Sequence, residues 1–448
     1  MGKHGISSKG TTSASKKKTK TKYSDTKNEQ PIKTRRKTTK RDVISYENVP
    51  IDSYEQYSEA KTKFKRKKIN KRILKRCLLI FAILVIIFLA VFIIANRQSL
   101  TWDNINLWFS EHIIGEDGSG YPATLSGTSV SKGNFTLVNG RPCYASDTSY
   151  IELNSNAGEI INSQISFNNP VIRGTRNNTI VYGVDGTGYM IHNSKKRTYK
   201  GSTEDSIYSA DINDNGSYAI VTGGSDYLSV LRAYDNNSKQ IYSYSFADYY
   251  VTCVSINYDG SGAVCCGFTT ENGAEKTKIY VLDFTKEKSI KEYDLSESVI
   301  YDIFYLSDNI VSAVADDSVY TFELDSKDIN KLDYESRILT DYTYNPDTRT
   351  FAIALSRSGD GHNCDIISFN SNGRDEFTIN SSYKVDSISL YKGNLGILSE
   401  NMAYILNEDG SVALSAEAGS DARTLLVAGS DKGYILGISE IRTIEFSK

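Results

Sequence analysis

One short run of the sequence has oxygen ligands at the spacing of the first half of a calcium loop: Asp211, Asn213, Asn215 and Gly216. A calcium loop ends in a bidentate glutamate at its twelfth position, and Thr222 stands there instead. The surrounding run NDNGSYAIV (213–221) is typical of a turn between two strands, where Asn and Gly tolerate positive φ. We therefore predict a structural turn and no metal site.

The cysteines offer thiol chemistry, and three of the six are close in sequence: Cys253, Cys265 and Cys266. A hairpin folded about Asp259–Gly260 would set Cys253 opposite Cys266, so a disulfide between the two strands is conceivable. Buried free thiols are the alternative, and they are the simpler interpretation because Cys143 and Cys364 would otherwise be left over. No Cys-x-x-Cys or Cys/His pair predicts zinc.

His362 is one of only four histidines and lies in the run SRSGDGHNCD (356–365), near Asp360 and Asp365. This run is as polar as a surface loop, and the chain has neither a G-x-S-x-G nor an H-E-x-x-H motif. We therefore predict no catalytic, cofactor-binding or metal-binding residue, and a protein that is not an enzyme.

The elements that would position any site are short strands. After Ser119, runs of Val, Ile, Tyr, Phe and Thr alternate with Asn, Asp, Gly and Ser turns, and units of about 40 residues repeat, which is typical of β-propeller blades. The first strands of the units are predicted at Asn134–Val138, Val171–Arg173, Tyr208–Ile212, Val251–Ile256, Ile300–Tyr305, Leu339–Tyr344, Asp386–Leu390 and Arg423–Val427.

The last unit has only three strands before the chain ends, and Ala123–Val130 supplies a fourth. Closing the ring in this way removes the open sheet edges. The fold class that we predict is all-β: a propeller over residues 123–448, with eight blades of four antiparallel strands and seven blades as the alternative.

The part before the propeller is predicted to hold a membrane anchor. Residues 1–76 form a disordered basic cytoplasmic tail, because they are too poor in apolar groups to fold. Residues 77–96 form a transmembrane helix, since Cys77 begins about 19 apolar residues without a charge, more than the apolar run of a signal peptide. Residues 97–122, with the interfacial Trp102 and Trp108, form a juxtamembrane helix and a linker.

Charge sets the orientation of this anchor. About 24 Lys and Arg stand against about 7 acids before Cys77, and about 28 against about 47 after it. Positive flanks stay in the cytoplasm, so we predict a single-pass protein of the cell membrane with an extracellular C-terminal domain. The basic runs 15–22 and 33–41 resemble nucleic-acid patches, but beside a membrane we expect them on anionic lipid, with no nucleic acid bound.

Several segments carry a resemblance to an uncharacterised family of membrane-anchored propellers of Gram-positive bacteria, a domain of unknown function: LTWDNINLWF (100–109), GSGYPATLSG (118–127) and NNPVIRGTRNNTIVYGVDGTGY (168–189). The blade SYIELNSNAGEIINSQIS (149–166) also resembles those of quinoprotein-like and WD40-like propellers. The resemblance implies a cell-envelope location and no known activity. Some quinoprotein dehydrogenases have a vicinal disulfide, but this chain has no Trp after Trp108 to sandwich a quinone, so we predict no cofactor.

Three loops between second and third strands are longer than the others: TGGSDYLS in the third unit, TTENGAEKTK in the fourth and SRSGDGHNCD in the sixth. Rigid scaffolds carry recognition on such loops. We predict a non-enzymatic binding or scaffold module for a cell-surface protein, peptide or cell-wall glycan, with its site near the third and fourth blades. The alternatives are a surface sensor or signalling receptor and a propeller enzyme, a hydrolase or lyase.

Overall fold

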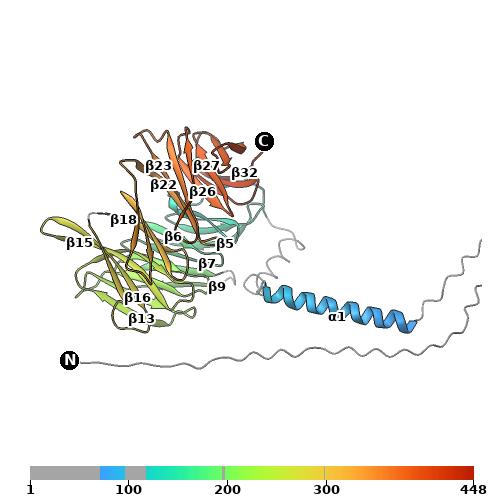
Figure 1. Ribbon diagram of the computed structural model, residues 1–448, viewed down its shortest axis with the longest axis horizontal. Helices are drawn as coiled ribbons and strands as arrows, with labels where there is room; N and C mark the ends of the chain where they lie inside the picture. The colour runs from blue at the N-terminus through green and yellow to red at the C-terminus, as the bar shows by residue number, and fades with distance from the viewer. Residues whose placement is uncertain (1–70, 96–117, 194–196, 297) are drawn as a thin grey trace, which may run out of the picture. The chain divides into compact units, whose positions relative to one another are not determined.

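The computed structural model describes residues 71–95, 118–193, 197–296 and 298–448 (Figure 1). Residues 1–70 of the predicted tail and residues 97–117 of the predicted juxtamembrane segment, with its two tryptophans, lie outside the described residues. Residues 71–76, which were predicted to be disordered, are instead helical, because the helix begins six residues before the apolar run. The helix α1 (Lys71–Ala95) has no Gly or Pro to interrupt it. All of its described large apolar side chains are exposed, among them Leu84 and Phe88. Among the described residues, no helix is long and apolar enough to cross a membrane, so the predicted span is not confirmed.

The rest of the described chain forms eight four-stranded antiparallel sheets, the blades of a propeller (Figure 1). The eight-bladed prediction is confirmed, and the seven-bladed alternative is wrong. Within each of blades 1 to 7 the strands follow one another in sequence order, because tight turns join antiparallel neighbours. The first strand of each blade lines the central channel. Both ends of each of these strands lie within one residue of the predicted ends.

The strands of the first four blades have the following bounds. Blade 1 follows the 3-10 turn η2 (Lys132–Asn134) and has β2 (Phe135–Val138), β3 (Arg141–Ala145), β4 (Ser149–Leu153) and β5 (Glu159–Gln164). Blade 2 has β6 (Pro170–Gly174), β7 (Asn178–Gly183), β8 (Gly188–Asn193) and β9 (Arg197–Ser202). Blade 3 has β10 (Ile207–Ile212), β11 (Tyr218–Thr222), β12 (Ser229–Tyr234) and β13 (Gln240–Phe246). Blade 4 has β14 (Tyr250–Ile256), β15 (Gly262–Glu271), β16 (Ala274–Asp283) and β17 (Lys291–Ser296).

The second half of the ring continues the same order. Blade 5 has β18 (Ile300–Tyr305), β19 (Ile310–Ala315), β20 (Ser318–Glu323) and β21 (Ile329–Asp333). Blade 6 has β22 (Ile338–Asn345), β23 (Thr350–Ser356), β24 (Cys364–Phe369) and β25 (Asp375–Ser381). Blade 7 has β26 (Ser387–Tyr391), β27 (Asn394–Ser399), β28 (Met402–Leu406) and β29 (Val412–Glu417). Blade 8 has β30 (Thr424–Val427), β31 (Lys432–Leu436), β32 (Glu440–Glu445) and β1 (Ala123–Thr124).

The ring closes as predicted, with the first strand of the domain completing the last blade. The strand β1 pairs antiparallel with β32, and the Leu125 amide donates to the Ser439 carbonyl at 2.9 Å. The predicted strand was too long, because Gly127 at φ 98° turns the chain away from the sheet edge. The following segment is held by Arg423, whose guanidinium donates to the Val130 carbonyl at 3.0 Å.

Small and aromatic residues alternate in the packing between blades. The second strands carry fully buried alanines such as Ala263 and Ala352, which let neighbouring sheets approach closely. Larger rings fill the wider gaps: Phe351 and Phe369 stack with their centroids 4.2 Å apart. This core positions the first strands around the central channel.

Candidate functional site

The calcium-like turn is a structural turn, as predicted. The Asn213 and Asn215 side-chain oxygens both accept from the Ser217 amide, at 3.0 and 2.8 Å. The Asn213 amide group also donates to the Asn257 carbonyl of the next blade at 2.9 Å. In the described part of the chain, no group of three or more His, Cys, Asp and Glu side chains could hold a metal ion. The asparagines therefore fasten blade 3 to blade 4.

Asp211 points away from that turn and joins two first strands. Its carboxylate accepts from the Ile256 amide at 2.9 Å and from the Ser255 hydroxyl at 3.1 Å. Asp341 joins the first strands of blades 6 and 7 in a similar way, since its carboxylate accepts a hydrogen bond from the Ile388 amide at 2.8 Å. Burial raises the pKa of both carboxyl groups to about 6, although these hydrogen bonds favour the ionised form.

The raised pKa of Asp211 predicts a pH-dependent cost to stability. Between about pH 4 and pH 6 the unfolded chain releases this proton while the folded chain keeps it, so stability falls as pH rises. Asn can still accept from the Ile256 amide, and it carries no charge. We expect the free energy of unfolding of Asp211→Asn, relative to that of the unsubstituted chain, to rise by up to about 3 kcal/mol between pH 4 and pH 7. Urea unfolding of both chains at several pH values measures this, and a difference that stays constant with pH would contradict it.

An ion pair crosses the central channel between blades 2 and 5. The Arg173 guanidinium on β6 donates to both carboxylate oxygens of Asp302 on β18, at 2.7 and 2.9 Å. The Tyr342 hydroxyl on β22 lies 3.4 Å from the same carboxylate. The carboxylate of Asp302 raises the pKa of the Arg173 guanidinium well above its usual value. The channel cavity around it measures about 430 Å³. These contacts hold opposite parts of the ring together and leave both charged groups engaged with each other.

The cysteines have the predicted register but form no disulfide. Cys253 lies opposite Cys266 in the β14–β15 register, and the five cysteines of the propeller are buried free thiols. Cys266 packs with Cys253 on the side of blade 5, whereas Cys265 packs on the side of blade 3, because neighbouring strand residues point to opposite faces. The disulfide alternative is therefore wrong, and a vicinal bond is equally absent.

These thiols are predicted to be unreactive in the folded protein. Burial raises the pKa of Cys253 to about 12 and that of Cys265 and Cys266 as well, so thiolate is scarce at neutral pH. In a Cys77→Ser chain, we expect labelling by an aromatic disulfide reagent to proceed only at the rate of unfolding. Rapid labelling of Cys253 in native buffer, located by peptide mass, would refute this. Denaturant should release all five thiols as the positive control.

The loop that carries His362 is organised by backbone contacts. The His362 carbonyl accepts a hydrogen bond from the Ser356 hydroxyl at 3.1 Å, and the His362 amide donates one to the Asp360 carboxylate at 3.0 Å. Asp365 lies at the base of the loop and binds two guanidiniums, Arg357 at 2.7 Å and Arg337 at 2.9 Å. Within the described residues these groups form no nucleophile, base and oxyanion arrangement.

The three runs predicted as long loops lie on one rim of the propeller, which we call the loop rim. It consists of the turns between second and third strands and the connections between successive blades. In blade 4 the prediction of a long loop is wrong, because the run 269–278 extends β15 and β16 and leaves only the two-residue turn Asn272–Gly273. Blade 4 projects furthest, because β15 and β16 pair without interruption up to the Glu271–Ala274 pair (Figure 1, yellow). Loops on a rigid frame are suited to recognition.

Exposed aromatic and apolar side chains gather on the loop rim of blades 3 to 6. We call this set the aromatic patch: Tyr227, Tyr250, Phe268, Val299, Tyr301 and Ile338. Tyr250 and Phe268 lie opposite each other across β14 and β15, with ring centroids 6.1 Å apart. Large exposed apolar patches mark interaction surfaces on soluble domains.

A repeated β-bulge helps to create the patch. The pairing of the first two strands slips at the same place in four successive blades, at Tyr208, Thr252, Tyr301 and Thr340. A bulge leaves one residue out of register and changes the direction of its side chain. In blade 5 the residue is Tyr301, which is exposed on the loop rim. The corresponding registers in blades 1, 2, 7 and 8 run without a slip.

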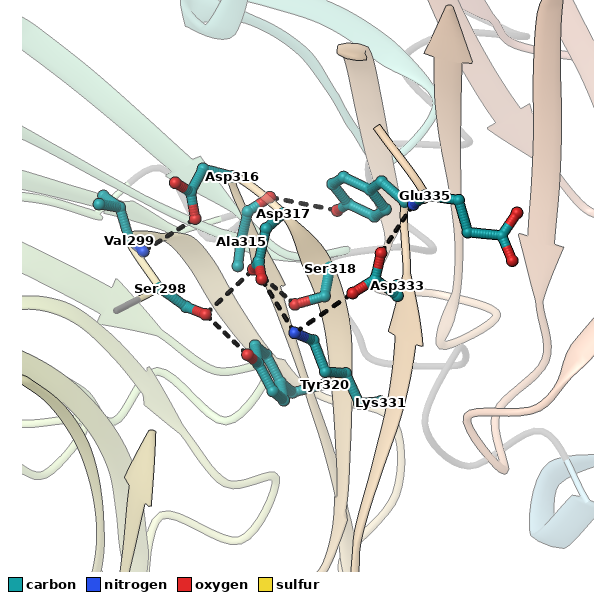
Figure 2. A network of polar contacts seen from close by, with 11 residues as sticks. Ser298, Val299, Ala315, Asp316, Asp317, Ser318, Tyr320, Lys331, Asp333 and Glu335 are labelled. Atoms are coloured by element: carbon teal, nitrogen blue, oxygen red, sulfur yellow. Dashed lines mark hydrogen bonds and ion pairs between the residues drawn. The ribbon is translucent and has the colours of Figure 1, made fainter. Parts of the chain in front are cut away.

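A polar network fixes the start of blade 5 beneath the patch (Figure 2). The Val299 amide donates to Asp316 at 2.9 Å, and the Ser298 hydroxyl donates to Asp317 at 3.0 Å. Lys331 binds Asp317 at 2.9 Å. Burial disfavours ionisation of Asp317, but hydrogen bonds from Ser318, Lys331 and Ser298 outweigh it and lower its pKa. Ser298 and Val299 are therefore fastened to the turn between β19 and β20.

A cleft of about 250 Å³ lies within the aromatic patch, between blades 4 and 5. Phe268 and Val299 stand at its walls, and Thr252, Cys266 and Gly267 also line it. It has the size for one apolar side chain of a partner. The sequence predicted the rim and the neighbourhood of blade 4, but it missed this cleft, the bulges and the ion pair across the channel.

Comparisons with known proteins give one family match and matches to solved structures. No curated protein matches the chain. Among solved structures, BamB from Moraxella catarrhalis has a TM-score of 0.43 at 12% identity, over 73% of this chain and all of that one. The hydrazine synthase of Kuenenia stuttgartiensis has a TM-score of 0.41 at 11% identity, over 72% of this chain and 97% of that one. The model of a family of unknown function, DUF5711, matches residues 123–446, the whole propeller ring, and the chain belongs to this family.

Proposed function

We propose that this protein is a non-enzymatic binding module that captures a protein partner on the loop rim of blades 3 to 6. The observation that carries the proposal is the aromatic patch around the cleft between blades 4 and 5. Aromatic side chains supply much contact area at a low entropic cost, and hot spots of interfaces lie in such pockets. Hydrogen bonds to Asp316 and Asp317 also fasten the start of blade 5 at this rim.

The proposal includes a tether to the cell membrane. The apolar run from Cys77 would anchor the chain, with the basic residues before it in the cytoplasm and the propeller outside. The exposed apolar side chains of α1, such as Leu84 and Phe88, support this, because an uncovered face of this kind is unfavourable in water. A tethered propeller would present its rim to partners at the cell surface.

The test is quantitative recovery of partners from membranes that contain the full chain. One variant replaces residues 270–276 with a two-residue turn, and a second carries Phe268→Ser and Tyr301→Ser. Ile290→Ser is the matched control, because Ile290 is an exposed apolar residue of blade 4 in the turn at the opposite rim. We expect both rim variants to lose at least about 90% of the partner retained by the control, which corresponds to about 1.4 kcal/mol. Equal recovery by all chains would refute the proposal.

A further inference from the structure

We infer that the segment bound at the aromatic patch is cationic: an extended polypeptide with Lys or Arg side chains on either side of one apolar anchor. This inference rests on the proposed function, since it names the chemistry of the partner at the same rim. It follows from the charges around the patch, from the ring faces that the patch presents, and from one lysine of the chain itself.

Exposed acids lie along the loop rim of blades 2 to 5. They are Asp185, Glu204, Asp226, Asp248, Glu271, Asp316, Asp333 and Glu335. The bases among them are already bound within the chain: Lys276 to Glu271, Lys331 to Asp317 and Arg337 to Asp365. No salt bridge is described for Asp226, Asp248 or Asp316 in the part of the chain that the structure covers. A field of one sign around an apolar centre favours a partner of the opposite charge and speeds its association.

The rings of the patch add a second means of binding a cation. An ammonium or guanidinium group over the face of Tyr or Phe gains about 0.5–1 kcal/mol at an exposed site. Tyr250, Phe268 and Tyr301 are all exposed. Phe268 lines the cleft between blades 4 and 5, the Tyr250 ring lies 6.1 Å from that of Phe268, and Tyr301 follows Ile300 of the cleft wall. An apolar side chain in the cleft would therefore place its basic neighbours over rings and within reach of carboxylates.

The chain carries an internal example of this recognition next to the patch. The Lys278 ammonium lies 5.4 Å from the centroid of Tyr249 and 5.8 Å from that of Tyr280. It also pairs with Glu292 at 3.0 Å and with Asp294 at 3.3 Å. Rings together with carboxylates thus hold a half-buried lysine on this same blade, two residues along β16 from Lys276.

The charge pattern separates this partner from other classes. Nucleic acid and anionic wall polymers would be repelled by the acids, and a neutral glycan would stack on the rings without needing them. A cationic peptide uses both features. Its binding must therefore depend on salt and on the acids, whereas glycan binding must not.

The experiment measures binding of a fluorescent peptide, acetyl-Gly-Lys-Lys-Phe-Lys-Lys-Gly-amide, to the full chain in detergent. The comparison peptide has Glu in place of every Lys. The variants are Phe268→Ser, the triple change Asp226→Asn, Asp248→Asn and Asp316→Asn, and Ile290→Ser as the control. We expect Kd of about 1 mM or tighter for the Lys peptide, at least tenfold weakening in the first two variants, and none in the control. Raising salt from about 0.05 to about 0.3 M should also weaken binding.

Each outcome decides between the two proposals. No measurable binding of the Lys peptide, or equal binding of the Glu peptide, overturns the cationic partner. The serine variants then decide what remains. If they still lose the partner recovered from membranes, or bind less of a soluble wall glycan, the rim remains the binding surface and only the cationic chemistry of the partner is wrong. If Phe268→Ser changes nothing in either assay, the proposed function fails as well.

Discussion

A propeller that begins at residue 132, without residues 118–131, is expected to lose roughly 5 kcal/mol of stability, an amount comparable with the whole stability of many domains. The missing segment supplies β1, the buried Val130, and Tyr121, whose ring centroid lies 5.6 Å from that of Tyr434. Its loss exposes the edge of β32 and the apolar surface around Ile441. Exposed edges pair with other chains, so aggregation should accompany the loss.

Urea unfolding and size-exclusion chromatography of chains 118–448 and 132–448 measure this effect. The control is a permuted chain in which residues 118–131 follow Lys448 through a short Gly-rich linker. Because β1 lies antiparallel to β32, this segment can return to its place as a hairpin partner. We expect the permuted chain to regain most of the stability. A stable, monomeric 132–448 chain would show that the ring does not depend on this closure.

The second large effect is expected from breaking the ion pair across the channel. Asp302→Ala leaves the Arg173 guanidinium without its counter-charge, among side chains of the channel wall. Removing one partner of a buried pair costs about 3–5 kcal/mol, and the 38% exposure of the Arg173 side chain reduces this to about 2–3 kcal/mol. Denaturant unfolding of Arg173→Met, of Asp302→Leu and of the double variant that combines them gives the coupling energy.

The double variant is expected to be more stable than Asp302→Ala alone, because apolar groups of similar volume leave no unpaired charge. Glu271→Ala serves as the control for a surface pair: it removes the exposed partner of Lys276 and should change stability by less than about 0.5 kcal/mol. Equal effects of Asp302→Ala and Glu271→Ala would mean that the pair across the channel contributes no more than a surface contact.

The sequence predicted those features of the fold that repeat in every blade. Alternating apolar residues placed the first strands, and runs such as NDNGSYAIV marked the turns, because the same local chemistry recurs at each unit. The Cys253–Cys266 register followed from counting along one hairpin. These are short-range properties, and short-range patterns are visible in a single sequence.

The candidate site depends on features that no local pattern encodes. Arg173 and Asp302 are 129 positions apart, and only ring closure makes them neighbours. The bulge at Tyr301 depends on how β18 pairs with β19, since the residue types alone would fit an unbroken ladder. The sequence analysis singled out neither Tyr301 nor Phe268, and the structure exposes both on the loop rim.

The central claim, that the loop rim of blades 3 to 6 is the binding surface, is tested most directly by photo-crosslinking in intact cells. Benzoylphenylalanine is placed in the full chain at Phe268, at Tyr301 or, on the opposite rim of blade 4, at Ile290. We predict one discrete crosslinked product from each of the first two positions and none from Ile290. Products from Ile290 alone, or the same products from all three positions, would contradict the assignment of the binding surface to this rim.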